Sequence, residues 1–504
     1  MQRHPRHTFT FTGATALFAA SVFTAPGAWA ADAASCHDKA VTIDGTGQAV
    51  VIGTEDADVI AAPAGSTVSA LAGDDTICVL PGGAATSTSI DAGEGDDTVD
   101  TSALVAESTV TADLGPGDDS FRGGTGSDQV MAGGGADQVA TGGGDDVVHS
   151  GFAGQPNPAD LDLGPGDDVL HWHGIQAAGG SVAFGDGSDT LIDSDGGTAA
   201  IDAAQKVVTR GGEPVLVWDG SVTTYVVESQ AAQVSFDGTD AAETFVVRDP
   251  AAGAATPTVD VDMGGGDDTM TLRSRVLDGS AWAGGAGDDL IQVAYDYSTI
   301  YLDLRSGQFE TGAPDVTPDQ HVSGVENVEA MTAAMTVKGD DSDNTLDLRG
   351  CSVTAIGRAG SDDISWGVDF TDRPTLPCTG KELVARGGKG DDAIVGSSGA
   401  DRLLGHSGAD WIKAKTGTDI VSGGADDDRL RGNAGDDKLR GGPGDDDIAG
   451  NGGNDKVQGD KGGDRLLAHG GDDKLIGGLG LDRGYGGKGV DRGTSIERRY
   501  NIER

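Results

Sequence analysis

A single register runs without interruption through the last quarter of the chain. From Gly387 to Thr494 the sequence divides into twelve consecutive nonapeptides, such as GNAGDDKLR from Gly432 and GGPGDDDIA from Gly441. Position six is always aspartate, position four is glycine in eleven of the twelve, and position eight is aliphatic in the first ten. A flexible Gly/Asp linker needs no register, so this period indicates a repeat architecture.

The period also predicts the local structure. Glycines at positions one, two and four permit the positive φ angles of a tight turn, and the three residues after the aspartate form a short strand whose middle side chain points inward. Two nonapeptides make one coil of eighteen residues, with two short parallel sheets back to back around a narrow aliphatic core. At position eight of the last two repeats, Gly484 and Gly493 suit a terminus with no further rung to cover.

The pattern closely resembles GGxGxDxUx, the hemolysin-type or repeats-in-toxin (RTX) calcium-binding repeat. The resemblance implies a parallel β-roll that binds calcium ions between successive turns, through the position-six carboxylate and turn carbonyls. Carried over residue by residue, it makes the twelve position-six aspartates the expected ligands. They are Asp392, Asp401, Asp410, Asp419, Asp428, Asp437, Asp446, Asp455, Asp464, Asp473, Asp482 and Asp491.

Electrostatics gives an independent reason for a cation. Turns on one edge recur every eighteen residues, so the aspartates form two columns with neighbouring strands about 4.8 Å apart. Two carboxylates at that spacing repel by about 1 kcal/mol in water and about 3–4 kcal/mol at an effective dielectric constant of 20. All-oxygen ligation suits calcium, so we expect several calcium ions and folding that is coupled to their binding.

Similar turns recur upstream in broken register. A regular mini-array spans 114–149 and places Asp119, Asp128, Asp137 and Asp146 at position six, where they are also candidate calcium ligands. Isolated copies place further aspartates at the same point: Asp58, Asp75, Asp97, Asp168, Asp189, Asp268, Asp289 and Asp362. We therefore expect an all-β chain, a parallel β-roll or β-solenoid that is regular in the C-terminal quarter and irregular upstream.

This gives a provisional division of the chain. A signal peptide (1–30) precedes an irregular solenoid (31–198) and a β-rich segment with sparse repeats (199–337). Irregular repeats with a disulfide (338–386), the nonapeptide array (387–494) and a short tail (495–504) follow.

The N-terminus predicts export. Arg3 and Arg6 precede an apolar run that is too short for a membrane span, and Ala28-Trp29-Ala30 reads as a cleavage site after Ala30. An N-terminal signal departs from the uncleaved C-terminal signal that is typical of the RTX family. The four cysteines allow three pairings, of which proximity favours Cys36–Cys78 with Cys351–Cys378.

Catalytic motifs are weak in this sequence. No H-E-x-x-H motif occurs, and Gly405-His406-Ser407-Gly408-Ala409 is in register as a nonapeptide rather than as a nucleophile elbow. His171-Trp172-His173 places two imidazoles on one strand face without a visible third metal ligand. We therefore predict a non-enzymatic extracellular calcium-binding protein of the cell surface or matrix. The alternative is an exported hydrolase or lyase with its site in 199–337 and the array as a calcium-driven folding module.

Basic residues suggest a partner other than calcium. At position seven on one sheet of the array the sequence reads Arg402, Ile420, Lys438, Lys456, Lys474 and Arg492. These cations either balance the charge of the calcium sites or form an outward ladder for an anionic cell-surface polysaccharide. With a net charge of −48 we expect no nucleic-acid partner, and no segment reads as a membrane span.

Overall fold

The computed structural model describes residues 35–195, 197–228, 231–248, 257–273, 279–294, 299–311, 320–367, 378 and 380–502. Every helix or strand assigned within these ranges is a β-strand, which confirms the predicted all-β class. No helix in this part of the chain has the length and hydropathy needed to cross a membrane. The predicted signal peptide lies outside the described residues.

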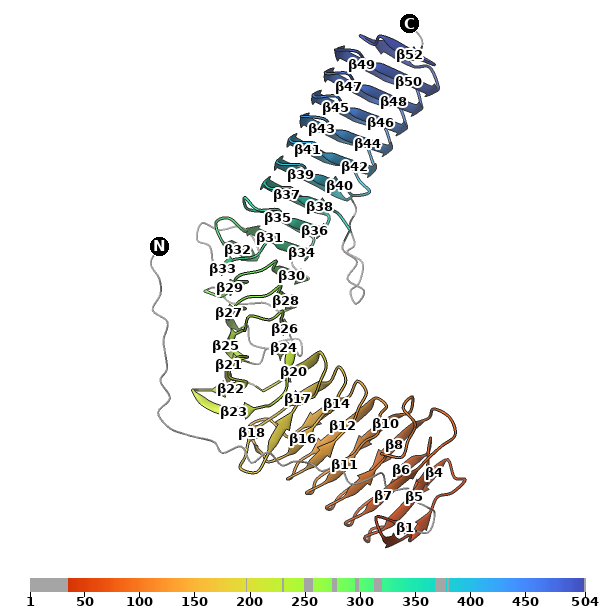
Figure 1. Cartoon of the computed structure of the whole chain (residues 1–504), viewed down its shortest axis with the longest axis vertical. Helices are drawn as coiled ribbons and strands as arrows, with labels where there is room; N and C mark the ends of the chain where they lie inside the picture. The colour runs from red at the N-terminus through yellow and green to blue at the C-terminus, as the bar shows by residue number, and fades with distance from the viewer. Residues whose placement is uncertain are drawn as a thin grey trace.

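The strands stack as a parallel β-solenoid with two faces (Figure 1). One face, which we call the long sheet, is a single ladder from β4 (Val50–Ile52) to β52 (Arg498–Tyr500). The other face is divided into an 8-stranded N-terminal sheet, from β3 (Ile43–Asp44) to β19 (Ser181–Ala183), and an 18-stranded C-terminal sheet. The C-terminal sheet begins with β21 (Gly197–Asp202) and ends with β51 (Arg492–Thr494).

In the nonapeptide array the strands alternate between the two faces. Strands eighteen residues apart pair in parallel register, as Leu439 does with Val457. The C-terminal sheet contains β39 (Glu382–Lys389), β41 (Arg402–Ser407), β43 (Ile420–Ala425), β45 (Lys438–Pro443), β47 (Lys456–Lys461) and β49 (Lys474–Leu479). The long sheet contains β40 (Ala393–Val395), β42 (Trp411–Thr416), β44 (Arg429–Ala434), β46 (Asp447–Gly452), β48 (Arg465–Gly470) and β50 (Arg483–Lys488).

Two antiparallel meanders interrupt the parallel stack. In one, β21 pairs with β22 (Val207–Arg210), which pairs with β23 (Glu213–Val217). In the other, β31 (Ile300–Asp303), β32 (Gln308–Thr311) and β33 (Gln320–Ser323) pair in the same way. Each meander places three strands where a regular coil would place one.

The meanders explain the curvature of the molecule. Each adds two strands, or about 10 Å, to one face. In the long sheet, by contrast, β20 (Asp189–Asp193) still pairs directly with β24 (Val222–Glu228), and β30 (Leu290–Ala294) with β34 (Asn327–Met331). A face with extra strands must lie on the outside of a curve, and Figure 1 shows the rod bent with β21–β23 on its convex side.

The core is a continuous row of aliphatic side chains, and residues of the C-terminal tail cover its last turn. At position eight, residues from Ile394 to Leu475 are buried. Gly484 and Gly493 do not simply mark an uncovered end, because Ile496 and Ile502 of the tail occupy the space where their side chains would lie. The tail also adds β52 to the long sheet and stacks Tyr500 on Tyr485, with ring centroids 4.5 Å apart.

Both predicted disulfides are present. Cys36 bonds to Cys78, which fixes the small hairpin of β1 (Ser35–Cys36) and β2 (Lys39–Ala40) near the first turns. Cys351 bonds to Cys378 just before the nonapeptide array. Each disulfide thus ties together a part of the chain where the repeats are irregular.

Candidate metal centre: two columns of buried aspartates

The twelve position-six aspartates form two stacked columns, one along each edge of the solenoid. All twelve are buried, with at most 3% of each residue exposed. In each column the backbone N–H of one aspartate donates to Oδ1 of the aspartate in the next turn. This N···O distance is 2.9 Å from Asp410 to Asp428 and 2.9 Å from Asp437 to Asp455.

The second carboxylate oxygen has no protein partner in eleven of the twelve residues. Their Oδ2 atoms are buried and make no hydrogen bond within the part of the chain that the structure describes. In nine of these eleven repeats Oδ2 faces the position-one glycine, as Asp437 faces Gly432, and a side chain at the glycine would overlap it. Because a buried, unpaired carboxylate oxygen is costly, this atom requires a cation or a proton.

Asp401 is the exception. The backbone N–H of Ser397 donates to its Oδ2 at 2.6 Å, and the Ser397 hydroxyl donates to its Oδ1 at 2.7 Å. Ser397 stands at position two, where five of the twelve repeats of the array have glycine and none of the others has serine. Of the twelve predicted ligands, Asp401 is therefore the one whose carboxylate is already satisfied by the protein.

The turn backbone completes an oxygen-rich environment. At position four Gly408 has φ +122°, and a side chain there would overlap the carbonyl oxygen of Gly390 in the preceding turn. No group of three His, Cys, Asp or Glu side chains among the described residues is arranged to hold a metal ion. Carboxylates and turn carbonyls together are the donor set of a hard cation such as calcium, so these residues fit that ion.

Eleven of the twelve array aspartates have raised pKa values. Burial is the main cause, and the neighbouring aspartates of the column add to it. The pKa is raised to about 8 for Asp410, to about 7 for Asp419 and to about 6 for Asp437. The columns therefore resist carrying full negative charge near neutral pH unless a cation compensates it.

The columns extend upstream of the array. Asp119 donates its N–H to Asp137, and Asp128 donates its N–H to Asp146, so the four predicted residues of the mini-array occupy the same kind of site. The isolated aspartates join them in the same manner: Asp58 to Asp75, Asp75 to Asp97, Asp97 to Asp119, Asp146 to Asp168, Asp168 to Asp189, Asp268 to Asp289 and Asp362 to Asp392.

Four further residues occupy column positions that the sequence motif does not reveal. Glu243 donates its N–H to Asp268 and Asn344 to Asp362, while Glu326 and Glu497 accept from Asp289 and Asp482. Glu243 and Asn344 each follow a glycine by five residues, which is the spacing of positions one and six. A search for glycine followed five residues later by any carboxylate or amide would have found these two, but not Glu326 or Glu497.

Position-five residues form a second, exposed ladder. The side chain of Asp427 accepts from the N–H of Asp445, and Asp445 in turn accepts from the N–H of Gly463, both at 2.6 Å. Here the side chain accepts from the following turn, whereas a position-six side chain accepts from the preceding one. The paired carboxylates thus play two different structural roles.

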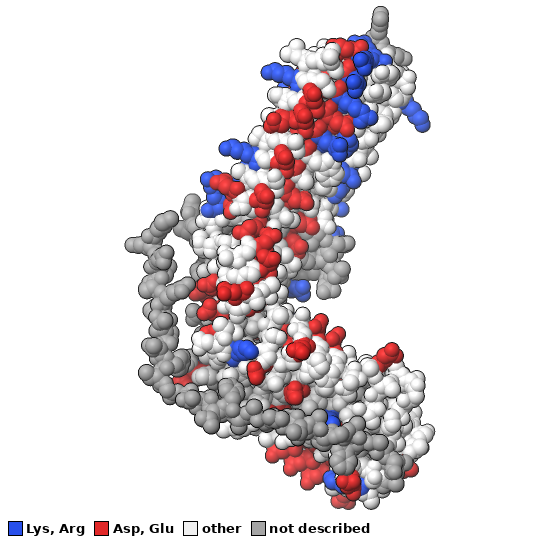
Figure 2. Space-filling model, viewed as in Figure 1, with Lys and Arg blue, Asp and Glu red and all other residues white. Residues whose placement is uncertain are grey.

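The predicted cation ladder lies in register on the C-terminal sheet. Lys438 pairs with Lys456, Lys456 with Lys474, and Lys474 with Arg492, and all four residues are exposed. Arg402 is separated from them by Ile420. None of these five cations takes part in an ion pair with another described residue. Figure 2 shows lysine and arginine on both sides of an acidic band along this arm.

The opposite face of the array is also basic. On the long sheet the column reads Arg429, Asp447, Arg465 and Arg483. Asp447 binds Arg465 at 3.2 Å and the neighbouring Arg431 at 3.0 Å. This face therefore compensates part of its own charge, which the lysine ladder does not do within the described chain.

The two weak catalytic candidates lie in ordinary solenoid positions. His171 stacks on His149 of the preceding rung, with ring centroids 3.9 Å apart, and His173 contacts Asp195 at 3.3 Å. No third side chain completes a metal site with His171 and His173 among the described residues. Gly405–Ala409 belongs to β41 and the turn after it, with no helix following, unlike a nucleophile elbow.

These features define a repeat protein whose parallel β-solenoid stacks a buried acidic residue at nearly every turn. The family model of the RTX calcium-binding nonapeptide repeat matches four stretches, at residues 113–148, 386–421, 422–457 and 458–492. The chain therefore contains four copies of this calcium-binding unit, as the sequence pattern predicted. No curated protein matches the chain.

Proposed function

We propose that this is a secreted, non-enzymatic protein that folds upon binding several calcium ions and acts at a cell surface or in an extracellular matrix. The observation that carries the proposal is the buried, unpaired Oδ2 in eleven of the twelve array aspartates. Each such oxygen destabilises the metal-free fold and becomes a ligand once calcium enters. Two disulfides fit an oxidising, extracellular compartment, as does the predicted signal peptide.

Calcium titration of the full chain tests this proposal. Far-ultraviolet circular dichroism in chelator should show a largely disordered chain, and millimolar calcium should restore the β-sheet spectrum. Calorimetry should count several ions per chain, with magnesium at the same concentration as the control. The proposal would be rejected if the spectrum in chelator were that of a fully folded chain, or if calorimetry detected no heat of calcium binding.

We further propose that the lysine ladder binds an anionic polysaccharide. Four exposed cations in consecutive rungs, about 4.8 Å apart, suit a polymer that carries a negative charge on each successive unit. Binding should weaken with salt, because exposed charges are screened.

A pull-down on an acidic polysaccharide checks the ladder. The triple variant Lys438→Ser, Lys456→Ser, Lys474→Ser should lose most of the binding in calcium. The matched control Arg429→Ser, Arg465→Ser, Arg483→Ser changes the net charge equally on the opposite face and should retain it. Equal loss in both variants would reduce the effect to net charge and contradict a specific ladder.

A further inference from the structure

Three acidic residues of the columns differ from the others because a hydroxyl group of the protein already satisfies their carboxylates. Each of them follows a serine or threonine by four residues, which places the hydroxyl at position two of the turn. The pairs are Thr54 with Asp58, Thr239 with Glu243, and Ser397 with Asp401. None of the other acidic residues in the columns follows a serine or threonine at this spacing. The hydroxyl therefore marks a distinct kind of turn.

The three hydroxyl residues make corresponding hydrogen bonds. The N–H of Ser397 donates to the Asp401 carboxylate at 2.6 Å, and the Ser397 hydroxyl donates to it at 2.7 Å. The N–H of Gly399 donates to the hydroxyl oxygen at 3.0 Å. Thr54 and Thr239 form the same three bonds in their own turns. The hydroxyl thus accepts one hydrogen bond from the turn and donates the other to the carboxylate.

The backbone of the Ser397 turn differs from that of its neighbours. In the eleven other turns of the array, positions two and four both have positive φ, as in His406 with +87° and Gly408 with +122°. Neither Ser397 nor Gly399 has φ in this left-handed region. In this conformation Ser397 presents both its N–H and its hydroxyl to the carboxylate. These donors carry partial positive charge, so they stabilise the carboxylate and disfavour a cation beside it.

The hydroxyl residues occur where series of column residues begin. We call a series of column residues in consecutive turns a run, and the described chain has four runs. They start at Asp58, Asp128, Glu243 and Asp401, and the residues in register one turn earlier are Val41, Val110, Thr223 and Leu383. An ion at the first turn of a run would therefore have one carboxylate fewer than an ion inside the run. Calcium affinity depends on the number of charged ligands, so these first turns are the weakest places for an ion.

Asp128 is the start of a run that lacks the hydroxyl. Gly124 stands four residues before it, and its Oδ2 is buried without a partner in the described chain. Of the four starting residues, Asp128 is thus the one that still requires a cation or a proton. The difference between Asp128 and the other three follows the residue at position two, because all four are first in their runs.

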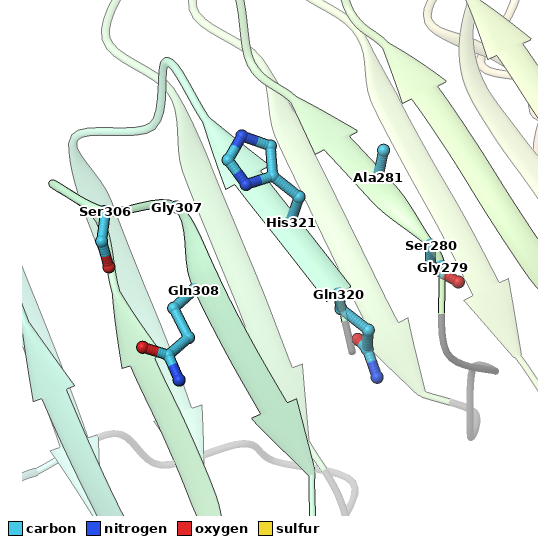
Figure 3. Close-up of a pocket in the computed structure, with 8 residues that line it drawn as sticks. All are labelled: Gly279, Ser280, Ala281, Ser306, Gly307, Gln308, Gln320 and His321. Carbon is cyan, nitrogen blue, oxygen red and sulfur yellow. The ribbon is translucent and has the colours of Figure 1, made fainter. Parts of the chain in front are cut away.

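Uncharged residues can hold the place of position six elsewhere on the C-terminal sheet. On neighbouring strands they are Val234 on β25 (Ala231–Asp237), Val259 on β27 (Thr258–Asp262), Ser280 just before β29 (Ala281–Ala283) and Gln320 on β33. Figure 3 shows Ser280 and Gln320 in their two strands. The N–H of Val259 donates to the Ser280 hydroxyl at 3.0 Å, as it would to a position-six carboxylate. A hydroxyl can therefore continue this ladder of hydrogen bonds without a carboxylate.

We propose that a hydroxyl at position two excludes calcium from a turn, so that the turns of Asp58, Glu243 and Asp401 bind no ion. This inference rests on the proposed calcium binding and specifies which turns of the columns take part in it. In these three turns the serine or threonine does what the ion does elsewhere, because it neutralises a buried carboxylate. Calcium is then confined to the later turns of each run and to the turn of Asp128.

Long-wavelength anomalous diffraction tests the positions of the ions. Crystals of the full chain grown in calcium should show calcium peaks at the carboxylates of Asp437 and Asp128, and none at those of Asp58, Glu243 or Asp401. A calcium ion coordinated by any of these three carboxylates would overturn the proposal. A folded chain without any calcium peak would contradict the proposed function itself, and this inference with it.

Two matched variants test the same point in solution. Native mass spectrometry in calcium counts the ions on each chain, and magnesium at the same concentration controls for non-specific adducts. Asp437→Asn should lower the number of calcium ions by one. Asp401→Asn should leave the number unchanged, because this carboxylate binds Ser397 rather than an ion. The proposal is wrong if Asp401→Asn also loses an ion.

A third variant tests whether the hydroxyl holds the turn. Ser397→Ala should make amide hydrogen exchange in residues 396–401 about tenfold faster in saturating calcium, which is the effect of losing one hydrogen bond to a charged group. Ser398→Ala changes an exposed hydroxyl of the same turn and should leave the exchange rate as in the wild type. Equal exchange rates in the two variants would show that the Ser397 hydroxyl does not replace the ion.

Discussion

Position six of the nonapeptide places two opposing demands on one side chain. Oδ1 must accept the N–H of the preceding turn, which any carboxylate or amide can do. Oδ2 is buried with no protein donor, which only a cation or a proton relieves. Asn344 shows that an amide can occupy the same column: its backbone N–H donates to Asp362 at 2.9 Å, and its side-chain nitrogen donates to the carbonyl oxygen of Glu326 in the preceding turn at 2.9 Å. Position six therefore requires a hydrogen-bond acceptor for the fold and a carboxylate for the metal.

Asp437→Asn separates these two demands. The asparagine keeps the Oδ1 hydrogen bond but removes the charge, so the variant should be less stable than the wild type in calcium by about 1–3 kcal/mol. In chelator it should be more stable, because one repulsive charge is lost from the column. Thermal unfolding in calcium and in chelator measures both signs.

The neighbouring residue provides the matched control. Asp436 is exposed and accepts from the N–H of Asn454 at 2.7 Å. Asp436→Asn should therefore change stability by less than Asp437→Asn in either condition. If both variants behave alike with and without calcium, position six has no special relation to the metal.

At the scale of the element, the raised pKa values in the two aspartate columns make the metal-free fold sensitive to pH. In nine of the twelve array aspartates the pKa is raised to about 6–8, as for Asp464 and Asp410, from an unfolded value of about 3.9. A folded pKa above the unfolded one stabilises the metal-free fold below about pH 4, and this contribution is lost as the pH rises through 6–8.

Acidification should therefore act in opposite directions with and without calcium. In chelator, lowering the pH from 8 to 5 should increase the β-sheet signal in circular dichroism, because protons neutralise the columns. In limiting calcium, the same change should weaken calcium binding, because protons compete for the same oxygens. A metal-free chain that is equally disordered at pH 8 and pH 5 would contradict the raised pKa values.

At the same scale, the C-terminal tail caps the open end of the hydrophobic core. Ile496 is 6% exposed and packs on Gly484 and Gly493 at the open end of the core. Ile496→Ala should cost about 2–4 kcal/mol and fray the last turns, which hydrogen exchange would detect as faster amide exchange near β50. Leu481→Ala, at a side chain that is 78% exposed, should leave exchange unchanged. A uniform response along the array would instead show that the cap has no local role.

The sequence predicts what is periodic and misses what breaks the period. The regular array, its strand register and both disulfides follow from position six, position eight and cysteine proximity. The meanders do not, because β22 and β32 are short strands that pair with their sequence neighbours, and the nonapeptide period carries no signal for these hairpins. The sequence also fails to predict that Glu326 and Glu497 belong to the aspartate columns, since neither follows a position-one glycine.

At the scale of the whole molecule, each coil contacts only its neighbours, so shape follows from what each turn adds. The long sheet is uninterrupted, while the opposite face gains two strands at each meander. Curvature is thus set at two defined places rather than spread along the rod. The stacked aspartate columns of the regular arm and the curvature of the irregular part are therefore separate properties of one solenoid.

Deletion of residues 203–218 should straighten the first bend. The deletion removes β22 and β23 and leaves 219–221 to link β21 to β24, which equals the three-residue link 390–392 between β39 and β40. β21 already pairs in parallel with β25, so it can serve as the single strand of a regular coil. Small-angle X-ray scattering in calcium should then show a larger maximum dimension despite sixteen fewer residues. The variant must keep the β-sheet circular dichroism spectrum of the wild type, and an unchanged or smaller maximum dimension in such a folded variant would show that the meander does not cause the bend.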